Sequence, residues 1–216
     1  EDVSHAQGGL YKGRKLGGIG DVGAMSLMAG KCFAIGEGGM LVTNERLVYE
    51  RAVAFGHYER TGTSRYSNSA NAITDPWLAT YAGLPMGGFK YRMHQLSSAM
   101  GRVQLKSYDA RCAEIRRAMN AFLDGIQGTP GLVDRRVQWE NSNMGGWYAP
   151  CIGYRPEELG GLAVEKFCEA LRAEGVSGAG AGINKPHHVH PLFHSADIYG
   201  DGKSTVVAHA ARDVRQ

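Results

Sequence analysis

A single lysine lies in a run of apolar and small residues, MSLMAGKCFAIGEGGM from Met25 to Met40, and this run constrains the chain more than any other feature. The apolar stretches Val22–Leu27 and Met40–Asn44 have the length of short strands, which predicts that Lys31 lies in a loop between two strands. Apolar surroundings disfavour the charged form of a lysine, so its amine tends to be neutral and nucleophilic. Such an amine can form a Schiff base, whereas a structural lysine would extend its amine to solvent.

Local patterns predict the elements around this loop. Residues 8–21 are rich in glycine and basic residues and indicate a loop or hairpin before the first strand. Asn44 is expected to cap a helix over residues 45–55. Residues 56–88 turn polar and show no clean period, so we expect a long loop there that covers part of the protein.

The second half of the chain begins with a long amphipathic pattern. From Arg92 to Phe122 apolar residues recur at spacings of three and four, which predicts one long helix that ends within Gly125–Pro130. Strands are predicted near residues 132–137 and 147–154, with Trp147 and Tyr148 in the strand core rather than in a sugar-binding platform. A helix is expected from Pro156 to Glu174, ended by Gly175. The order strand, strand, helix indicates a small α+β domain that begins within the long helix.

Charge and cysteine usage narrow the function classes. The chain carries 24 basic and 21 acidic residues, a net charge of +3, and no long basic run, so neither nucleic acid nor an anionic membrane is expected as a partner. No apolar run approaches the ~20 residues that cross a bilayer. The four cysteines form no Cys-x-x-Cys pair, which favours a reducing cytoplasm over a disulfide framework. The opening at Glu1, without a methionine, is what we expect of a portion cut from a longer protein.

Four histidines near the C-terminus raise the question of a metal site, because imidazole is a common zinc ligand. They are His187, His188, His190 and His194. No carboxylate or cysteine stands near them at ligand spacing, and two adjacent histidines diverge on an extended segment. The sequence therefore predicts no metal site.

The neighbours of Lys31 suggest a cofactor. Asp2 and His5 precede the first predicted strand and Ser26 ends it. A carboxylate for a pyridinium nitrogen, a polar side chain for a ring hydroxyl, a hydroxyl for a phosphate and a lysine for an aldehyde are the groups that pyridoxal phosphate requires. The simpler alternatives are that Asp2 is a turn residue and that the Ser26 hydroxyl bonds to backbone.

These residues carry a resemblance to a family. Residues 1–45 resemble the cofactor segment of the DegT/StrS-type aminotransferases, with the order Glu-Asp, Tyr-Lys-Gly, Ser-x-x-x-x-Lys and Gly-Glu-Gly-Gly. The match continues at Gly87–Met93, which is similar to the family's Gly-Tyr-Asn-Tyr-Arg-Met, and again at Pro186-His187-His188. Two departures are Lys90, where the family usually has an asparagine, and Ser4, where a small apolar residue is common.

The resemblance implies an α/β fold of the fold type I group. Residues 1–105 would be the remainder of the large cofactor-binding domain, and residues 106–216 the small C-terminal α+β domain. Lys31 would hold pyridoxal 5'-phosphate and move a proton in catalysis. The other implied site residues are Asp2 at the pyridine nitrogen, His5 at the ring hydroxyl, Ser26 at the phosphate, Lys90 at the cofactor phosphate of a partner subunit, and Tyr91 and His188 near the substrate.

The implied activity is transfer of an amino group from glutamate or glutamine to a keto-sugar, nucleotide-linked, by a cytoplasmic homodimer with shared active sites. Amination of an inosose-type cyclitol is the nearest alternative, and a non-catalytic relative or a truncated, inactive product are the others. In the family, roughly the first half of the large domain precedes the Glu-Asp motif and supplies further cofactor contacts. We therefore expect this chain alone to hold an incomplete site.

Overall fold

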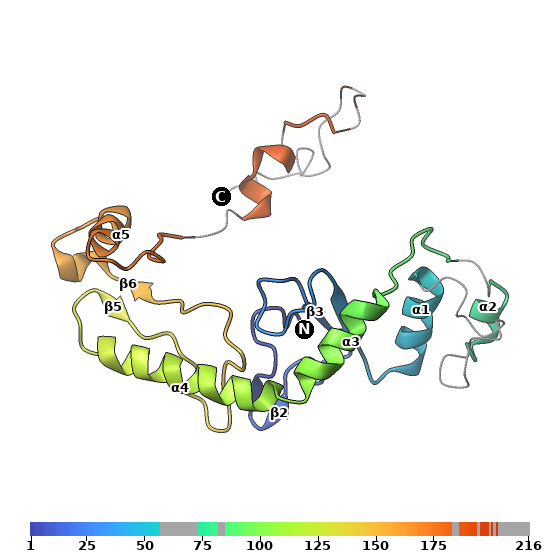
Figure 1. The fold of residues 1–216 in the computed structure, drawn as a ribbon. Coiled ribbons are helices and arrows are strands. Elements are labelled where there is room, and N and C mark those ends of the chain that lie inside the picture. The colour runs from blue at the N-terminus through green and yellow to red at the C-terminus, as the bar shows by residue number, and fades with distance from the viewer. Residues whose placement is uncertain are drawn as a thin grey trace. The chain divides into compact units, whose positions relative to one another are not determined.

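The computed structural model describes residues 1–56, 73–81, 85–182, 186–193, 195–198, 200 and 202. Contacts divide the chain into two compact units, Glu1–Gly153 and Tyr154–Gln216, and each is described by itself. Figure 1 shows the order of the elements along the chain. Within the described ranges, every helix is too short or too polar to cross a lipid bilayer.

The first unit opens with a two-stranded hairpin. Strands β1 (Leu10–Tyr11) and β2 (Arg14–Lys15) pair antiparallel. The two turn residues, Lys12 and Gly13, have φ of 48° and 79°. A two-residue turn with both φ values positive matches the right-handed twist of the strands that it joins. The hairpin predicted within residues 8–21 is thus confirmed.

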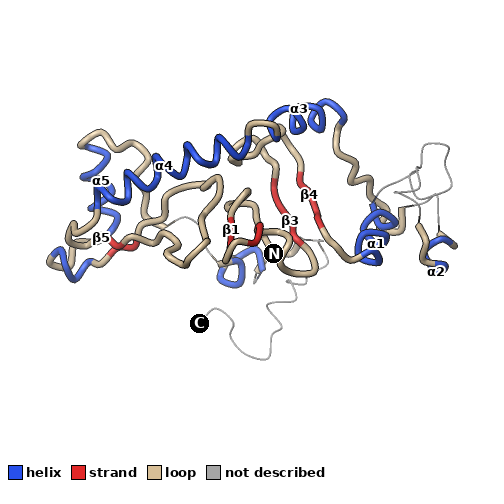
Figure 2. Tube along the Cα trace, turned by 90° about the horizontal axis from the view of Figure 1, so that it is seen from below, coloured by secondary structure: helices blue, strands red, loops and turns tan. Residues whose placement is uncertain are grey.

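A second antiparallel pair frames the lysine loop. Strand β3 (Gly23–Ser26) pairs with β4 (Gly39–Val42), with Ser26 opposite Gly39 (Figure 2). The first residues of the chain join β3 from its other side, through a parallel bridge between Asp2 and Ala24. Both predicted strands, and the position of Lys31 in the loop between them, are confirmed.

Two short helices follow, and the second lies within the stretch predicted as a long loop. Helix α1 (Arg46–Gly56) begins directly after Glu45, one residue later than predicted, so Asn44 does not immediately precede it. Helix α2 (Pro76–Ala79) lies inside the stretch predicted as one loop. Its proline at the first position and its Asp75 cap, which accepts a hydrogen bond from Leu78 N (2.9 Å), explain why a helix starts there. Residues 57–72 and 82–84 of the predicted loop lie outside the described residues.

The single long helix predicted from Arg92 is wrong, because two helices stand in its place. Helix α3 (Gln95–Leu105) ends at Lys106, and helix α4 (Tyr108–Ile126) begins after Ser107. Ser107 has φ −116° and ψ 4°, and its hydroxyl donates to Gln104 O (3.3 Å). A serine can offer the backbone such an alternative to helix, which apolar spacing does not reveal. The end of α4 lies where it was predicted.

The predicted strands after α4 are longer than the observed ones. Strands β5 (Leu132–Val133) and β6 (Gly153–Tyr154) form a two-residue ladder. Trp147 and Tyr148, predicted in a strand core, lie in a loop, and Trp147 has a φ of 41°. The strand prediction is therefore wrong over the first part of residues 147–154.

The second unit contains a broken helix. The predicted helix over 156–174 is a 3-10 turn, η2 (Pro156–Leu159), followed by α5 (Val164–Ala173). Gly160 and Gly161, with φ of 63° and 83°, separate the two. The Tyr154 hydroxyl donates to Leu162 O (2.8 Å) across this break. Two further 3-10 turns, η3 (His187–Val189) and η4 (Pro191–Phe193), follow.

One buried glutamine organises the core under the lysine loop. Gln7 donates from its side chain to Ser26 O (2.7 Å), and its side-chain oxygen accepts from Phe33 N (2.9 Å). Its own carbonyl accepts from the Tyr108 hydroxyl of α4 (3.1 Å). Around it lie the buried apolar residues Val3, Leu27, Ile35, Tyr108, Cys112 and Trp147. The lysine loop is therefore fixed from beneath by a satisfied polar group.

Candidate functional site

The N-terminal turn places Asp2 beside the end of β3. Asp2 Oδ1 accepts a hydrogen bond from Ser4 N (3.0 Å), and Ser4 Oγ accepts one from Ser26 N (3.0 Å). Hydrogen bonds from the Ser4 hydroxyl and backbone, and then the positive charges of His5 and Lys31, lower the pKa of Asp2 against the opposing effect of burial. Asp2 is therefore held as a carboxylate, within the electrostatic reach of His5 and Lys31.

Lys31 and His5 meet at the ring of Tyr148. The His5 imidazole stacks on the Tyr148 ring, with centroids 4.1 Å apart and an angle of 9° between the planes. Lys31 Nζ lies over the same ring, 4.3 Å from its centroid. Tyr148 is 44% exposed as a residue, so this cluster is accessible to solvent. Two of the residues predicted for the site, His5 and Lys31, thus lie together at Tyr148, which was not predicted for the site.

Ser26 stands where β3 ends, close to this cluster through Ser4. Its hydroxyl oxygen accepts from Met28 N (3.4 Å), so the alternative of a hydroxyl bonded to backbone describes it in this structure. Asp2 likewise makes the bond to the residue two positions on that a turn residue makes. Both side chains can still bind a ligand, because the Ser26 hydroxyl has a proton to donate and the Asp2 carboxylate remains charged.

The residue after the lysine anchors the loop. The Cys32 thiol lies against the carbonyl oxygens of Gly146 and Trp147, and its one proton can be donated to either of them. Burial raises the pKa of the Cys32 thiol. Cys32 is therefore a structural thiol in this loop rather than a reactive thiolate.

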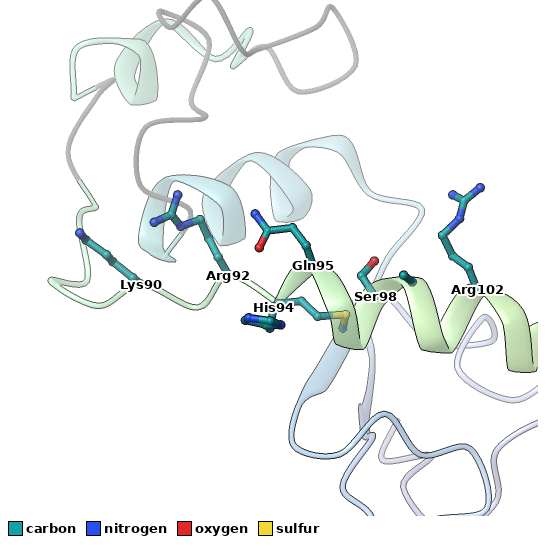
Figure 3. Close-up of a pocket in the computed structure, with 8 residues that line it drawn as sticks. Lys90, Arg92, His94, Gln95, Ser98 and Arg102 are labelled. Atoms are coloured by element: carbon teal, nitrogen blue, oxygen red, sulfur yellow. The ribbon is translucent and has the colours of Figure 1, made fainter.

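Lys90 and Tyr91 lie in a second place, the segment before α3. Lys90 lines a cavity of about 610 Å³ at the start of that helix (Figure 3). Arg92, Gln95 and Arg102 point to one side of α3 in this view. The lining residues are Lys90, Arg92, Met93, His94, Gln95, Ser98, Ala99 and Arg102, a set with cationic and no acidic side chains. Such a set at a helix start suits an anionic group.

Tyr91 contacts other aromatic residues beside this cavity. Its ring stacks on Phe55 of α1, with centroids 6.2 Å apart, and its backbone nitrogen donates to Gly56 O (2.8 Å). The ring remains 67% exposed. Tyr91 is therefore accessible to a substrate. Among the described contacts, none joins it to Lys31.

His188 belongs to the second unit. Its backbone forms part of η3, and its side chain lies outside what the structure describes, as does His194. In the described part of the chain, no three histidine, cysteine or acidic side chains gather in a way that could hold a metal ion. The expectation of no metal site therefore remains a prediction.

Sequence reasoning missed three residues of this region. Gln7 carries no local signal, and the local signal of Tyr148 is that of a strand residue, since each matters through contacts with distant parts of the chain. Ser4 did carry one, because it departs from the small apolar residue that is common at its position. That departure supplies the hydroxyl that joins Asp2 to Ser26.

Comparison with solved structures identifies the fold. The chain is similar to an aminotransferase from Psychrobacter cryohalolentis, with a TM-score of 0.64 at 22% identity, over 81% of this chain and 45% of that one. It is also similar to E. coli GDP-4-keto-6-deoxy-D-mannose-3-dehydratase with bound hydrated PLP, with a TM-score of 0.62 at 22% identity, over 81% and 43% of the two chains. The predicted α/β architecture of the fold type I group is thereby confirmed, in the portion that this chain spans.

Sequence comparison identifies the family. The spore coat polysaccharide biosynthesis protein SpsC of Bacillus subtilis is 28% identical, over 89% of this chain and 47% of that protein. A putative L-glutamine:3-amino-2,3-dideoxy-scyllo-inosose aminotransferase of Micromonospora echinospora is 31% identical, over 90% and 43%. The chain spans about half the length of the curated relatives it matches. The model of the DegT/DnrJ/EryC1/StrS aminotransferase family matches residues 1–214, almost the whole of this chain. The chain belongs to that family.

Proposed function

We propose that this chain carries the lysine-bearing portion of a pyridoxal-phosphate-dependent aminotransferase. The observation that supports this most directly is that His5 and Lys31 lie at one ring, that of Tyr148, 4.1 Å and 4.3 Å from its centroid, close enough to act on the Asp2 carboxylate, whose pKa is lowered first by hydrogen bonds from Ser4 and then by these two charges. Membership of the family supplies the reaction class.

The residues present fit the cofactor. Asp2, an ionised carboxylate, would hold the pyridine nitrogen protonated, and His5 would lie against the ring hydroxyl. The Ser26 hydroxyl has a proton to donate to the phosphate. When bound, pyridoxal phosphate supplies an electron sink for the carbon that loses a proton. Lys31 would hold the cofactor through its amine and then carry that proton between carbon atoms as a general base and acid.

We infer that the substrate is a keto-sugar linked to a nucleotide, with glutamate or glutamine as the amino donor. The cavity at Arg92 and Arg102 supports an anionic substrate, since a diphosphate would meet these two cationic side chains there. A neutral inosose-type cyclitol, the class that the name of the Micromonospora relative indicates, would make no use of that charge. Turnover of nucleotide-linked and free cyclic ketones, compared in one assay, decides between them.

We propose that the active unit is a homodimer with shared sites, in which Lys90 reaches the partner's cofactor phosphate. The exposed apolar side chains of α3, Leu96, Val103 and Leu105 among them, are what a covered helix would present. A cytoplasmic location is supported by four cysteines that are all free thiols. The division into a large domain to about residue 105 and a small domain after it also belongs to this proposal, as do the roles of Tyr91 and His188 near the substrate.

Borohydride trapping tests the catalytic assignment. Pyridoxal phosphate is added to the protein, the bond to lysine is reduced, and the labelled peptide is identified by mass. We expect the adduct on Lys31 and none at that position in Lys31→Gln.

Lys12→Gln is the matched control for trapping, because Lys12 Nζ also lies over a tyrosine ring, 5.3 Å from the centroid of Tyr11. This variant should leave the Lys31 adduct unchanged. Adducts spread evenly over surface lysines, with no preference for Lys31, would remove the proposal and favour a non-catalytic or inactive product.

A further inference from the structure

A segment from the far end of the first unit reaches the lysine loop. We call residues Asn141–Tyr148 the tyrosine arm. Its first half is bonded to the β1–β2 hairpin through backbone and side-chain atoms. These bonds are Leu10 N to Asn143 O (3.2 Å), Asn143 N to Leu10 O (2.9 Å), Gly13 N to Asn141 O (2.7 Å) and Lys12 N to Ser142 Oγ (2.9 Å). The arm therefore follows the hairpin rather than lying free in solvent.

The second half of the arm is fixed beside Lys31. Gly146 N donates to the carbonyl of Gln7 (2.8 Å), and Trp147 is only 7% exposed. Gly145 has a φ of 60°, and a β-carbon there would overlap the backbone of Gln7 and Gly9, so the close approach requires glycine. The bonds from the Cys32 thiol to the arm tie it to the residue next to Lys31. The position of Tyr148 is thus determined by several independent contacts.

We propose that Tyr148 is a positioning residue for Lys31 and His5, acting through its ring. The ring contacts both groups, at 4.3 Å from the amine nitrogen and 4.1 Å from the imidazole centroid. This role rests on the proposed function, in which those two residues contact the cofactor. It adds a side chain from residue 148 to the cluster of Asp2, His5 and Lys31, which comes from the first 31 residues.

Physical chemistry assigns the effect to the ring rather than to its hydroxyl. The face of a tyrosine ring attracts a lysine ammonium, and a parallel aromatic partner restricts the rotation of an imidazole. The Tyr148 ring therefore fixes the position of the Lys31 amine and the orientation of the His5 imidazole. Phenylalanine would preserve both contacts and leucine neither.

Chemical labelling of the cofactor-free chain tests this role. The rate of acetylation of Lys31 is measured at one pH and normalised to that of Lys106, an exposed lysine after α3. In Tyr148→Leu the amine loses the ring that it lies over, so we expect labelling to rise by about two- to fivefold. In Tyr148→Phe the rate should match that of the unsubstituted chain.

Tyr11→Leu is the matched control, since it removes the other tyrosine ring that lies under a lysine. It should leave the Lys31 rate unchanged. A second readout is the ring-proton chemical shifts of His5, which the Tyr148 ring current displaces. The displacement should disappear in Tyr148→Leu and persist in Tyr148→Phe.

An unchanged Lys31 rate together with unchanged His5 resonances in folded Tyr148→Leu overturns the proposal. If that variant does not fold, the test uses the unsubstituted chain, in which nuclear Overhauser contacts between the Tyr148 ring and the Lys31 side chain are measured. The absence of these contacts would also overturn the proposal. Trapping reports separately on the proposed function. A changed acetylation rate without an adduct on Lys31 would support the positioning role of Tyr148 and contradict the cofactor assignment. An adduct on Lys31 with an unchanged acetylation rate would support the cofactor assignment and contradict the positioning role.

Discussion

At the scale of single residues, Ser4 controls the charge of Asp2. Its backbone N–H donates to the Asp2 carboxylate (3.0 Å), and hydrogen bonding by its hydroxyl and then by this N–H is the leading cause of the lowered pKa. Because the folded pKa lies below the unfolded one, the stabilisation is present above the unfolded pKa of about 3.9 and is lost as the pH falls through the folded pKa. Asp2 therefore remains an anion to a lower pH in the folded chain than in the unfolded one.

We expect Ser4→Ala to raise the pKa of Asp2, since it removes the hydroxyl bond and leaves the backbone bond. The carboxyl-carbon resonance of Asp2, followed through an acid titration, measures the change. Ser4→Ala also removes the acceptor of Ser26 N (3.0 Å), and the loss of that bond should lower the unfolding free energy by about 0.5–1.5 kcal/mol, the usual worth of one hydrogen bond.

Ser4→Thr is the control for this substitution, because it keeps a hydroxyl at the same position, and Asp2 should titrate as in the unsubstituted chain. An Asp2 titration that is the same with alanine as with serine at position 4 would show that the hydroxyl bond does not form.

At the scale of elements, a buried carboxylate joins α1 to the start of α2. Glu50 is 1% exposed and accepts hydrogen bonds from Thr74 N (3.0 Å), Thr74 Oγ1 (2.6 Å), Asp75 N (2.8 Å) and Arg46 Nε (2.6 Å). Burial alone would raise the pKa of Glu50. Its bonds, those from Thr74 first, outweigh burial and lower the pKa to about 2. The contact between the two helices is therefore electrostatic and depends on pH.

Glu50→Gln should destabilise the chain by about 1–3 kcal/mol at neutral pH, because it leaves buried donors facing a neutral amide. The sign of the pH dependence follows from the lowered pKa. The stabilisation by Glu50 is complete above its unfolded pKa of about 4.3 and declines as the pH falls toward 2. Denaturant unfolding at several pH values should therefore show the two chains converging in acid.

Glu114→Gln is the comparison for Glu50, since Glu114 bonds to Arg117 (2.9 Å) with both side chains more than 70% exposed. An exposed ion pair is worth about 0–1 kcal/mol, so this substitution should have the smaller effect. Equal losses for Glu50→Gln and Glu114→Gln at neutral pH would contradict the assignment.

At the scale of the whole molecule, the predictions that held depend on neighbours in sequence. The hairpin follows from the turn at Lys12 and Gly13, and the loop around Lys31 from two apolar runs that flank it. The end of α4 follows from the glycines and proline after it. Each of these is decided within a few residues, where local rules are strongest.

The predictions that failed depend on contacts between distant residues or on short interruptions. Apolar spacing continues through Lys106 and Ser107, so nothing in the period announces the break between α3 and α4. Tyr148 carries the signature of a strand residue, yet the bonds of the tyrosine arm to the hairpin hold it in a loop. Tertiary contacts decide such positions, and a single sequence does not display them.

The tyrosine arm also sets the order in which the site can be assembled. The bond from Lys12 N to Ser142 Oγ joins residues 130 positions apart. Closing a loop of that length costs entropy before its contacts return any stabilisation, so contacts of this kind form late in folding. On the ribosome, chains grow at about 5–20 residues per second, so residue 148 follows residue 31 by roughly 6–23 seconds. The hairpin and the lysine loop can fold during that interval. The contacts of Lys31 and His5 with the Tyr148 ring form only after residue 148 has been synthesised.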